Sequence, residues 1–240
     1  MTPDVAVLGG AAHTTPALAW EPAPVTPRLA PGETHLWRVP TLPGDDGPAW
    51  TVLADAERHR ALSYADERAA RGFVKARAGL RAILAGYVGC EPEDVEFEAG
   101  VGGRPSVRGA HPDMDFSASR VEGTSVIAVT AGGKVGIDAE RISAVAAHGS
   151  PPWSFVREQA PPGLVDDLGD EGDRAFCIAW TRLEAYAKAC TNGLGGSDTG
   201  AGRCHVRSFV LTADLVCSLA EAGAQRRALR TFDLGRTAVA

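Results

Sequence analysis

The chain lacks the sequence features of a membrane, secreted or nucleic-acid-binding protein. It has no run of about 18 apolar residues, and it does not open with a basic segment followed by an apolar core. No nucleic-acid-binding motif is present, and a formal net charge of -6 opposes binding to nucleic acid through overall charge. We therefore predict a cytoplasmic protein that uses neither a membrane nor a nucleic acid.

Cysteine is too sparse and too scattered for a disulfide framework or a zinc site. The five cysteines form no C-x-x-C pair and have no histidine at zinc spacing, so reduced and inert thiols are expected. The glycine-rich segment after Gly193 has no Walker lysine, and no serine lies in a nucleophile elbow. These absences argue against zinc chemistry, P-loop phosphate binding and a serine nucleophile.

The chain does have an ordinary soluble composition, 45% hydrophobic and 22% charged, and its 240 residues suit one or two domains. The first 32 residues are rich in Ala, Pro and Thr without periodicity, so we expect a flexible lead-in over 1–32. Beyond it, strands are expected at 35–39, 95–98, 125–130, 135–140, 206–211 and 229–234, and helices at 67–87 and 174–190.

The order of these elements is similar in the two halves of the chain. Residues 213–220 fit a helix or a strand equally well, and 143–173 read as irregular. Because each half contains a helix followed by adjacent strands, we predict an α+β fold with halves at 33–133 and 134–240. The site is expected in the cleft between them.

The strand at 135–140 ends in two acids separated by one residue. Side chains alternate across a strand, so Asp138 and Glu140 are expected to point the same way. Two carboxylates on one face repel each other unless a cation lies between them, and Mg²⁺ prefers such oxygen ligands. The alternative is that the two acids are the solvated end of an ordinary strand.

A second stretch repeats polar residues at helical spacing. Trp180, Glu184 and Lys188 recur every four residues, so they should lie along one side of a helix. Glu184 and Lys188 are either an ordinary exposed ion pair or, in a functional interpretation, a metal ligand or general base beside a phosphate contact. The spacing alone favours the ordinary ion pair.

Four motifs in order carry a resemblance. They are Gly103-Arg-Pro105, Phe116-Ser-Ala-Ser-Arg120, Val135-Gly-Ile-Asp-Ala-Glu140 and Trp180-Thr-Arg-Leu-Glu-Ala-Tyr-Ala-Lys188. This succession resembles the G-K-P, F-N-x-S-H-S, V-G-x-D-x-E and W-T-x-K-E-A-x-x-K motifs of the Sfp-type 4'-phosphopantetheinyl transferases, over roughly residues 35 to 235.

The resemblance implies a monomer of two similar α/β halves related by a pseudo-twofold axis, with coenzyme A and Mg²⁺ in the cleft between the halves. The implied reaction moves the 4'-phosphopantetheine arm of coenzyme A to a serine of an acyl or peptidyl carrier protein. Adenosine 3',5'-bisphosphate is released, and the carrier changes from apo to holo form. Such enzymes serve polyketide or nonribosomal peptide biosynthesis.

The resemblance also assigns roles to individual residues. Asp138, Glu140 and Glu184 match the metal ligands, Glu184 matches the base for the carrier serine, and Lys188 matches the cation at the departing phosphate. The matches to coenzyme A contacts are Ser119 and Arg120 at the phosphates, Arg104 in place of the motif lysine, Arg60 at the 3'-phosphate and Phe73 at the adenine.

The sequence departs from the family pattern at Leu183, which stands where the motif has a lysine. One phosphate contact is then missing, unless the neighbouring Arg182 reaches the same phosphate. Arg120, Arg141 and Arg182 are candidates for a basic face that meets an acidic carrier protein.

Two other functions use the same charges. The protein could be a non-catalytic relative that binds a carrier protein or coenzyme A, or a magnesium-dependent hydrolase of coenzyme A. Three acids that converge on one cleft repel each other without a metal, which favours the working transferase.

Overall fold

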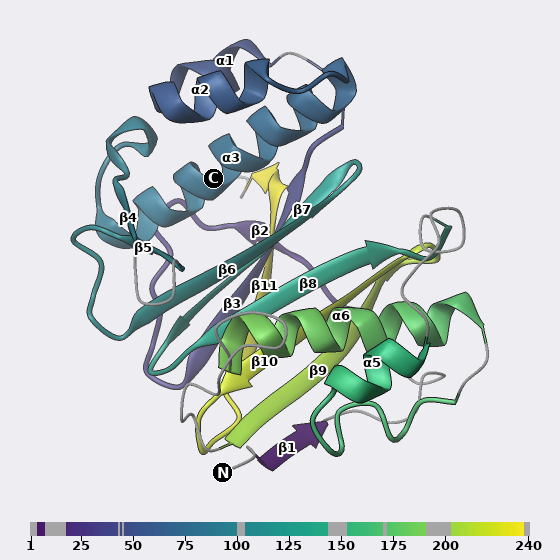
Figure 1. Ribbon diagram of the computed structural model, residues 1–240. Helices are drawn as coiled ribbons and strands as arrows, with labels where there is room; N and C mark the ends of the chain where they lie inside the picture. The colour runs from purple at the N-terminus through teal and green to yellow at the C-terminus, as the bar shows by residue number, and fades with distance from the viewer. Residues whose placement is uncertain are drawn as a thin grey trace.

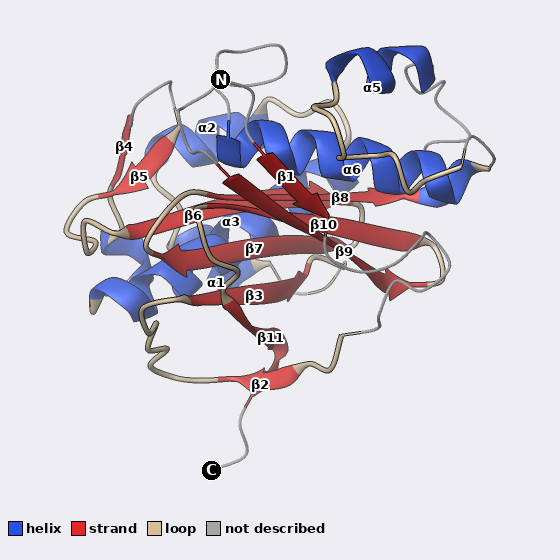
Figure 2. Ribbon diagram, turned by 90° about the horizontal axis from the view of Figure 1, so that it is seen from below, coloured by secondary structure: helices blue, strands red, loops and turns tan. Residues whose placement is uncertain are grey.

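Two β-sheets stacked against each other form the centre of the computed structural model, and Figure 2 shows them as layers with α6 over one of them. The structure describes residues 4–7, 18–42, 44, 46–99, 104–143, 153–169, 172–190 and 203–237. The four-stranded sheet runs in the order β1 (Asp4–Val7), β9 (Arg203–Thr212), β10 (Leu215–Ala222) and β8 (Val135–Arg141).

The five-stranded sheet runs in the order β2 (Glu21–Ala23), β11 (Ala228–Thr237), β3 (Glu33–Pro40), β7 (Thr124–Ala131) and β6 (Met114–Val121). A separate hairpin joins β4 (Phe97–Ala99) and β5 (Pro105–Val107). Strands β6 and β8 are the last strands of their sheets and pack side by side, so the two sheets meet there (Figure 1).

Helices α3 (Glu67–Val88) and α6 (Asp173–Cys190) cover the outer faces of the two sheets. Helices α1 (Gly47–Thr51) and α2 (Asp55–Leu62) pack on α3, and α5 (Trp153–Gln159) packs on α6. A 3-10 turn at Pro92–Asp94 follows α3. The predicted helix at 67–87 is confirmed: Asp66 accepts hydrogen bonds from the backbone N–H groups of Arg68 and Ala69, and Gly89 ends the helix at φ 75°. None of the described helices combines the length and apolar character needed to cross a bilayer.

The apolar core has three layers against the sheets and a small fourth cluster, built on Leu53, Ala61 and Val74, where α2 packs on α3. One layer lies between α3 and the five-stranded sheet, and another lies between α6 and the four-stranded sheet. The layer between the two sheets is built by alternate residues of facing strands, among them Leu36, Ala128, Ile137 and Leu219. This packing confirms the α+β class, whereas the pseudo-twofold relation between the halves stays a prediction.

Several sequence expectations differ from the structure. The flexible lead-in is wrong for 4–7 and 21–23, because β1 pairs in parallel with β9 and β2 pairs in parallel with β11. Three- and four-residue strands are too short for a readable period. Residues 1–3 and 8–17, and the glycine-rich segment from Gly193 to Gly202, lie outside the described residues.

The second half of the chain also departs from expectation. Helix α5 lies in the stretch expected to be irregular, and the ambiguous stretch at 213–220 contributes to strand β10. Strand β11 pairs with β3, so the last strand of the chain completes the sheet of the first half. The two sheets therefore exchange strands across the predicted boundary.

Candidate active site

The backbones of helix α6 and strand β8 lie in direct contact at the site. A β-carbon built on Gly136 would lie 1.9 Å from the carbonyl oxygen of Ala185 and 2.9 Å from the backbone nitrogen of Ala189. Only a glycine fits there, so α6 rests directly on the strand backbone. Behind it, the buried Thr181 hydroxyl lies 2.8 Å from that of Ser218 on β10, which fixes the rotation of the helix.

This contact brings Lys188 to Asp138. The Nζ atom of Lys188 donates a hydrogen bond of 2.6 Å to Oδ1 of Asp138 and one of 3.1 Å to the carbonyl oxygen of Ile137. Ser119 on β6 donates to the same carboxylate oxygen at 3.0 Å. Asp138 is buried, and its second oxygen, Oδ2, has no hydrogen-bond partner among the described residues.

Trp180, Glu184 and Lys188 share a helix face as predicted. From Ala175 to Cys190 they are the residues that are not fully buried. The structure therefore keeps the Glu184 and Lys188 side chains accessible beside β8, where Asp138 and Glu140 lie.

The acids of this site resist ionisation. Burial, together with the charges of Asp138 and Glu184, raises the pKa of Glu140 to about 7 in spite of the opposing charge of Lys188. Burial and the charge of Asp138 likewise raise the pKa of Glu184, and burial raises the pKa of Asp138 in spite of Lys188 and Ser119. Raised carboxyl pKa values mark a place where negative charge accumulates without enough compensation.

The donor atoms suit a hard divalent cation. In the described part of the chain, no three His, Cys, Asp or Glu side chains stand close enough together to hold a metal ion as they are. The carboxylate oxygens, and the orphaned Oδ2 of Asp138 above all, are nevertheless the ligand type that Mg²⁺ takes.

Arg120 follows the Ser119 contact on β6 and extends away from the acids. It hydrogen-bonds the hydroxyl of Tyr64 at 3.2 Å and the carbonyl oxygen of Ala69 at 3.3 Å. Its guanidinium carbon lies 6.0 Å from the ring centre of Phe73, and that of Arg60 lies 5.3 Å from the same ring. The structure thus brings together Arg60, Phe73 and Arg120, three residues that the resemblance assigned to coenzyme A.

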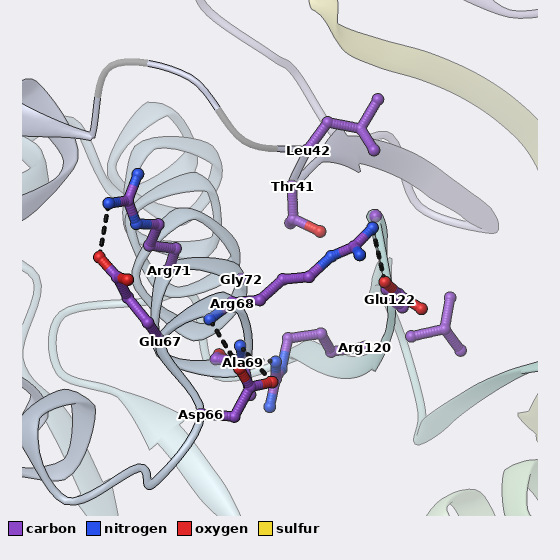
Figure 3. A pocket seen from close by; sticks show the side chains of 12 residues that line it. Thr41, Leu42, Asp66, Glu67, Arg68, Ala69, Arg71, Gly72, Arg120 and Glu122 are labelled. Atoms are coloured by element: carbon purple, nitrogen blue, oxygen red, sulfur yellow. Dashed lines mark hydrogen bonds and ion pairs between the residues drawn. The ribbon is translucent and has the colours of Figure 1, made fainter.

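A surface pocket of about 840 Å³ opens beside Arg120. It lies between the start of α3 and the β6–β7 turn, and Figure 3 shows the Arg68 side chain crossing it to Glu122, whose carboxylate is 2.7 Å away. The pocket is large enough for a nucleotide-sized ligand.

Arg104 has a different setting from the one expected. Its guanidinium donates to the Asp115 carboxylate at 2.7 Å and to the carbonyl oxygens of Phe116, Val135 and Lys188. The Arg104 guanidinium, which was expected to bind a phosphate, therefore binds acceptors of the protein itself.

The burial of Leu183 and Arg182 on α6 decides what was expected of these two residues. Leu183 is 2% exposed and packs in the core under α6, as its place on the apolar stripe indicated. Arg182 is equally buried and binds Asp167 at 2.5 Å and Ser208 at 3.0 Å. The idea that Arg182 reaches a phosphate or a carrier protein is therefore wrong. Arg141 is half-buried and donates to the Glu122 carbonyl oxygen at 2.8 Å.

The sequence interpretation missed Tyr64 and Asp115. Tyr64 lies between two helices in a stretch without motif, and nothing in the spacing marked it. Asp115 lies near the start of β6, and its pairing with Arg104, eleven residues earlier, has no sequence signal.

Taken together, the fold and site define an α+β protein with a lysine–carboxylate pair at the junction of two sheets. No family model matches the chain. Over 184 residues it is 30% identical to the 4'-phosphopantetheinyl transferase HetI of Nostoc sp., with 73% of this chain and 76% of the relative covered. It is 24% identical over 169 residues to slr0495 of Synechocystis sp., a provisionally named 4'-phosphopantetheinyl transferase, with 68% and 67% covered.

The chain therefore belongs to the 4'-phosphopantetheinyl transferase family, and it is a transferase. The family resemblance inferred from the four motifs is confirmed.

Proposed function

We propose that this protein transfers the 4'-phosphopantetheine arm of coenzyme A to a serine of an apo acyl or peptidyl carrier protein. The observation that carries the proposal is the Lys188–Asp138 pair at 2.6 Å, flanked by Glu140 and Glu184. The two relatives named as 4'-phosphopantetheinyl transferases support the same reaction.

In this reaction the carrier serine oxygen attacks the β-phosphorus of coenzyme A. The bond from that phosphorus to the bridging oxygen breaks, and adenosine 3',5'-bisphosphate leaves with the electron pair. Glu184, directly or through a water, takes the serine proton, and its raised pKa makes this carboxylate a stronger base than an exposed one. Lys188 supplies positive charge or a proton to the departing phosphate, and Asp138 holds the lysine in place.

Asp138, Glu140 and Glu184 are the residues that would hold Mg²⁺, directly or through water. Bound there, the metal would neutralise charge on the phosphate oxygens as the pyrophosphate bond breaks. The orphaned Oδ2 of Asp138 and the raised carboxyl pKa values of Glu140 and Glu184 support this assignment.

The pocket beside Arg120 is the proposed coenzyme A site. Arg120 lines this pocket and supplies positive charge, and Ser119, the residue before it, binds Asp138. Tyr64, Phe73 and Arg60 adjoin the pocket without lining it: the two rings lie beside the Arg120 guanidinium and offer flat surfaces for a base, and Arg60 contacts the same Phe73 ring. Service in polyketide or nonribosomal peptide biosynthesis, a monomeric state and a cytoplasmic location stay predictions.

The test is intact mass spectrometry of apo acyl and peptidyl carrier proteins incubated with this protein, coenzyme A and Mg²⁺. The expected result is a mass gain of one phosphopantetheine arm, lost with EDTA and in an Asp138→Asn variant. Cleavage of coenzyme A without a mass gain would indicate a hydrolase. Bound coenzyme A without either change would indicate the non-catalytic relative.

A further inference from the structure

Arg104 lies at the point where the two sheets and helix α6 meet. Its Nη2 atom is shared by the Asp115 carboxylate and the carbonyl oxygens of Phe116 and Val135, and its Nη1 atom donates to the carbonyl oxygen of Lys188. The Nε atom is buried without an acceptor among the described residues. One guanidinium thus joins β6, β8 and α6.

The bond to Lys188 satisfies a carbonyl oxygen in the last turn of the helix. Helix α6 ends at Cys190, so the Lys188 carbonyl has no N–H group four residues later within the helix. An arginine at this end also has the favourable charge for the negative pole of the helix dipole. Arg104 therefore caps the helix at the residue whose side chain binds Asp138.

Asp115 opens a row of side-chain contacts between β6 and β8. Alternate side chains of β6 accept hydrogen bonds from alternate backbone N–H groups of β8. Between paired strands, backbone carbonyl oxygens usually accept these bonds. The pairs are Asp115 with Val135 at 2.8 Å, Ser117 with Ile137 at 3.1 Å and Ser119 with Ala139 at 3.3 Å. This row sets the position of β8, and hence of Asp138, relative to β6.

We propose that Arg104 and Asp115 form a clamp that positions Lys188 against Asp138, and that Arg104 is a positioning residue rather than a coenzyme A contact. The inference rests on the proposed transferase function. It replaces the expectation that Arg104 binds a phosphate, because four protein acceptors already occupy the two terminal nitrogens.

The kinetic test compares Arg104→Lys and Asp115→Asn with the wild type. A lysine keeps the charge, but its one ammonium nitrogen replaces two guanidinium nitrogens that stand apart, so it cannot bind the acceptors of Nη2 and the Lys188 carbonyl oxygen together. In Asp115→Asn the amide still accepts from Val135 and loses the charge that holds Arg104. We expect both variants to lose about ten- to a hundredfold in kcat, with KM for coenzyme A within about twofold of wild type, because the reacting groups are displaced and the ligand contacts are kept.

Arg108→Lys is the matched control. Arg108 directly follows β5, is exposed, and binds Glu98 at 2.6 Å. It should leave both kinetic constants unchanged. A rise in KM for coenzyme A at unchanged kcat in Arg104→Lys would show a coenzyme A contact and overturn the clamp. A fall in Tm alone, with wild-type kcat below the transition, would also overturn it.

Hydrogen–deuterium exchange tests the clamp without any activity. Peptides that cover 184–190 and 134–140 should exchange about tenfold faster in both clamp variants than in the wild type, because a charge-assisted bond is lost at the helix end. Peptides of α3 should not change. Unchanged exchange at 184–190 would overturn the clamp. If the variants exchange faster but the wild-type protein transfers nothing, the proposed reaction is rejected and the clamp is kept.

Discussion

Gly136 and Ala185 meet through backbone atoms alone, since a β-carbon on Gly136 would lie 1.9 Å from the Ala185 carbonyl oxygen. The glycine of the V-G-x-D-x-E motif is therefore a packing requirement. It lets α6 approach β8 closely enough for Lys188 to reach Asp138, two residues further along the strand.

Replacement of this glycine should damage stability and activity together. In Gly136→Ala the new methyl group must push α6 away from β8, which should cost about 2 kcal/mol or more of unfolding free energy. Transfer should fall at least as far, because Lys188 moves with the helix. Urea unfolding and the carrier mass assay measure the two effects. Gly169→Ala is the control, since no atom of the described residues lies within 4 Å of a β-carbon there; equal stability of the two variants would contradict the packing argument.

Restoration of the motif lysine should not improve the enzyme. Leu183 is 2% exposed and surrounded by core residues, so Leu183→Lys forces an ammonium group into an apolar site. We expect a loss of about 3 kcal/mol of unfolding free energy and no gain in kcat. Leu183→Met, which conserves volume, should lose less than about 1.5 kcal/mol. A more active Leu183→Lys enzyme would show that this position does face the phosphates.

The sequence predicted the elements whose periodicity is long and whose signals agree. Helix α3 has an apolar stripe, an Asp66 cap and a Gly89 end, and strand β8 combines an apolar run with its two acids. The order of the motifs assigns Asp138 and Lys188 to a common site, and the two side chains are in contact there. In each of these cases the information is local, or is carried by motifs that occur in a fixed order.

What the sequence could not predict depends on long-range contacts. Strands β1 and β2 exist because β9 and β11 offer edges to them, not because of their own composition. The same holds for charge: the motif positions predict that Arg104 contacts a phosphate and make Arg182 a candidate for a phosphate or carrier-protein contact. Each instead binds a carboxylate, Asp167 and Asp115 respectively, from another part of the chain.

Arg120 should determine the affinity for coenzyme A. Its guanidinium lies beside Tyr64 and Phe73 at the pocket, where a phosphate would gain a charge-assisted hydrogen bond. Arg120→Ala should raise KM for coenzyme A about tenfold or more, as expected for a loss of about 1.5 to 3 kcal/mol. Arg230→Ala is the control. Arg230 is an exposed arginine on β11 that binds Glu21 at 2.7 Å. An unchanged KM in Arg120→Ala would exclude this pocket as the ligand site.

Glu140 should make the metal-free protein less stable as pH rises. Burial and the charges of Asp138 and Glu184 raise its pKa from the ordinary 4.5 to about 7, in spite of Lys188. Between these values the folded state holds a proton that the unfolded state has released, so stability is full below about pH 4.5 and declines towards pH 7. Because Glu140 is only half-buried, solvent screening should limit the loss to about 1 to 2 kcal/mol.

The variant Glu140→Gln isolates this effect from the other titrating groups. The amide mimics the protonated acid, so in EDTA the variant should match the wild type at pH 4 and be more stable than it above pH 7. Added Mg²⁺ should reverse the order, because a bound cation stabilises the ionised wild-type acid and not the amide. Urea unfolding across this pH range measures both differences. A wild type that gains stability relative to Glu140→Gln as pH rises without metal would contradict the raised pKa. Failure of Mg²⁺ to reverse the order would remove Glu140 from the metal ligands.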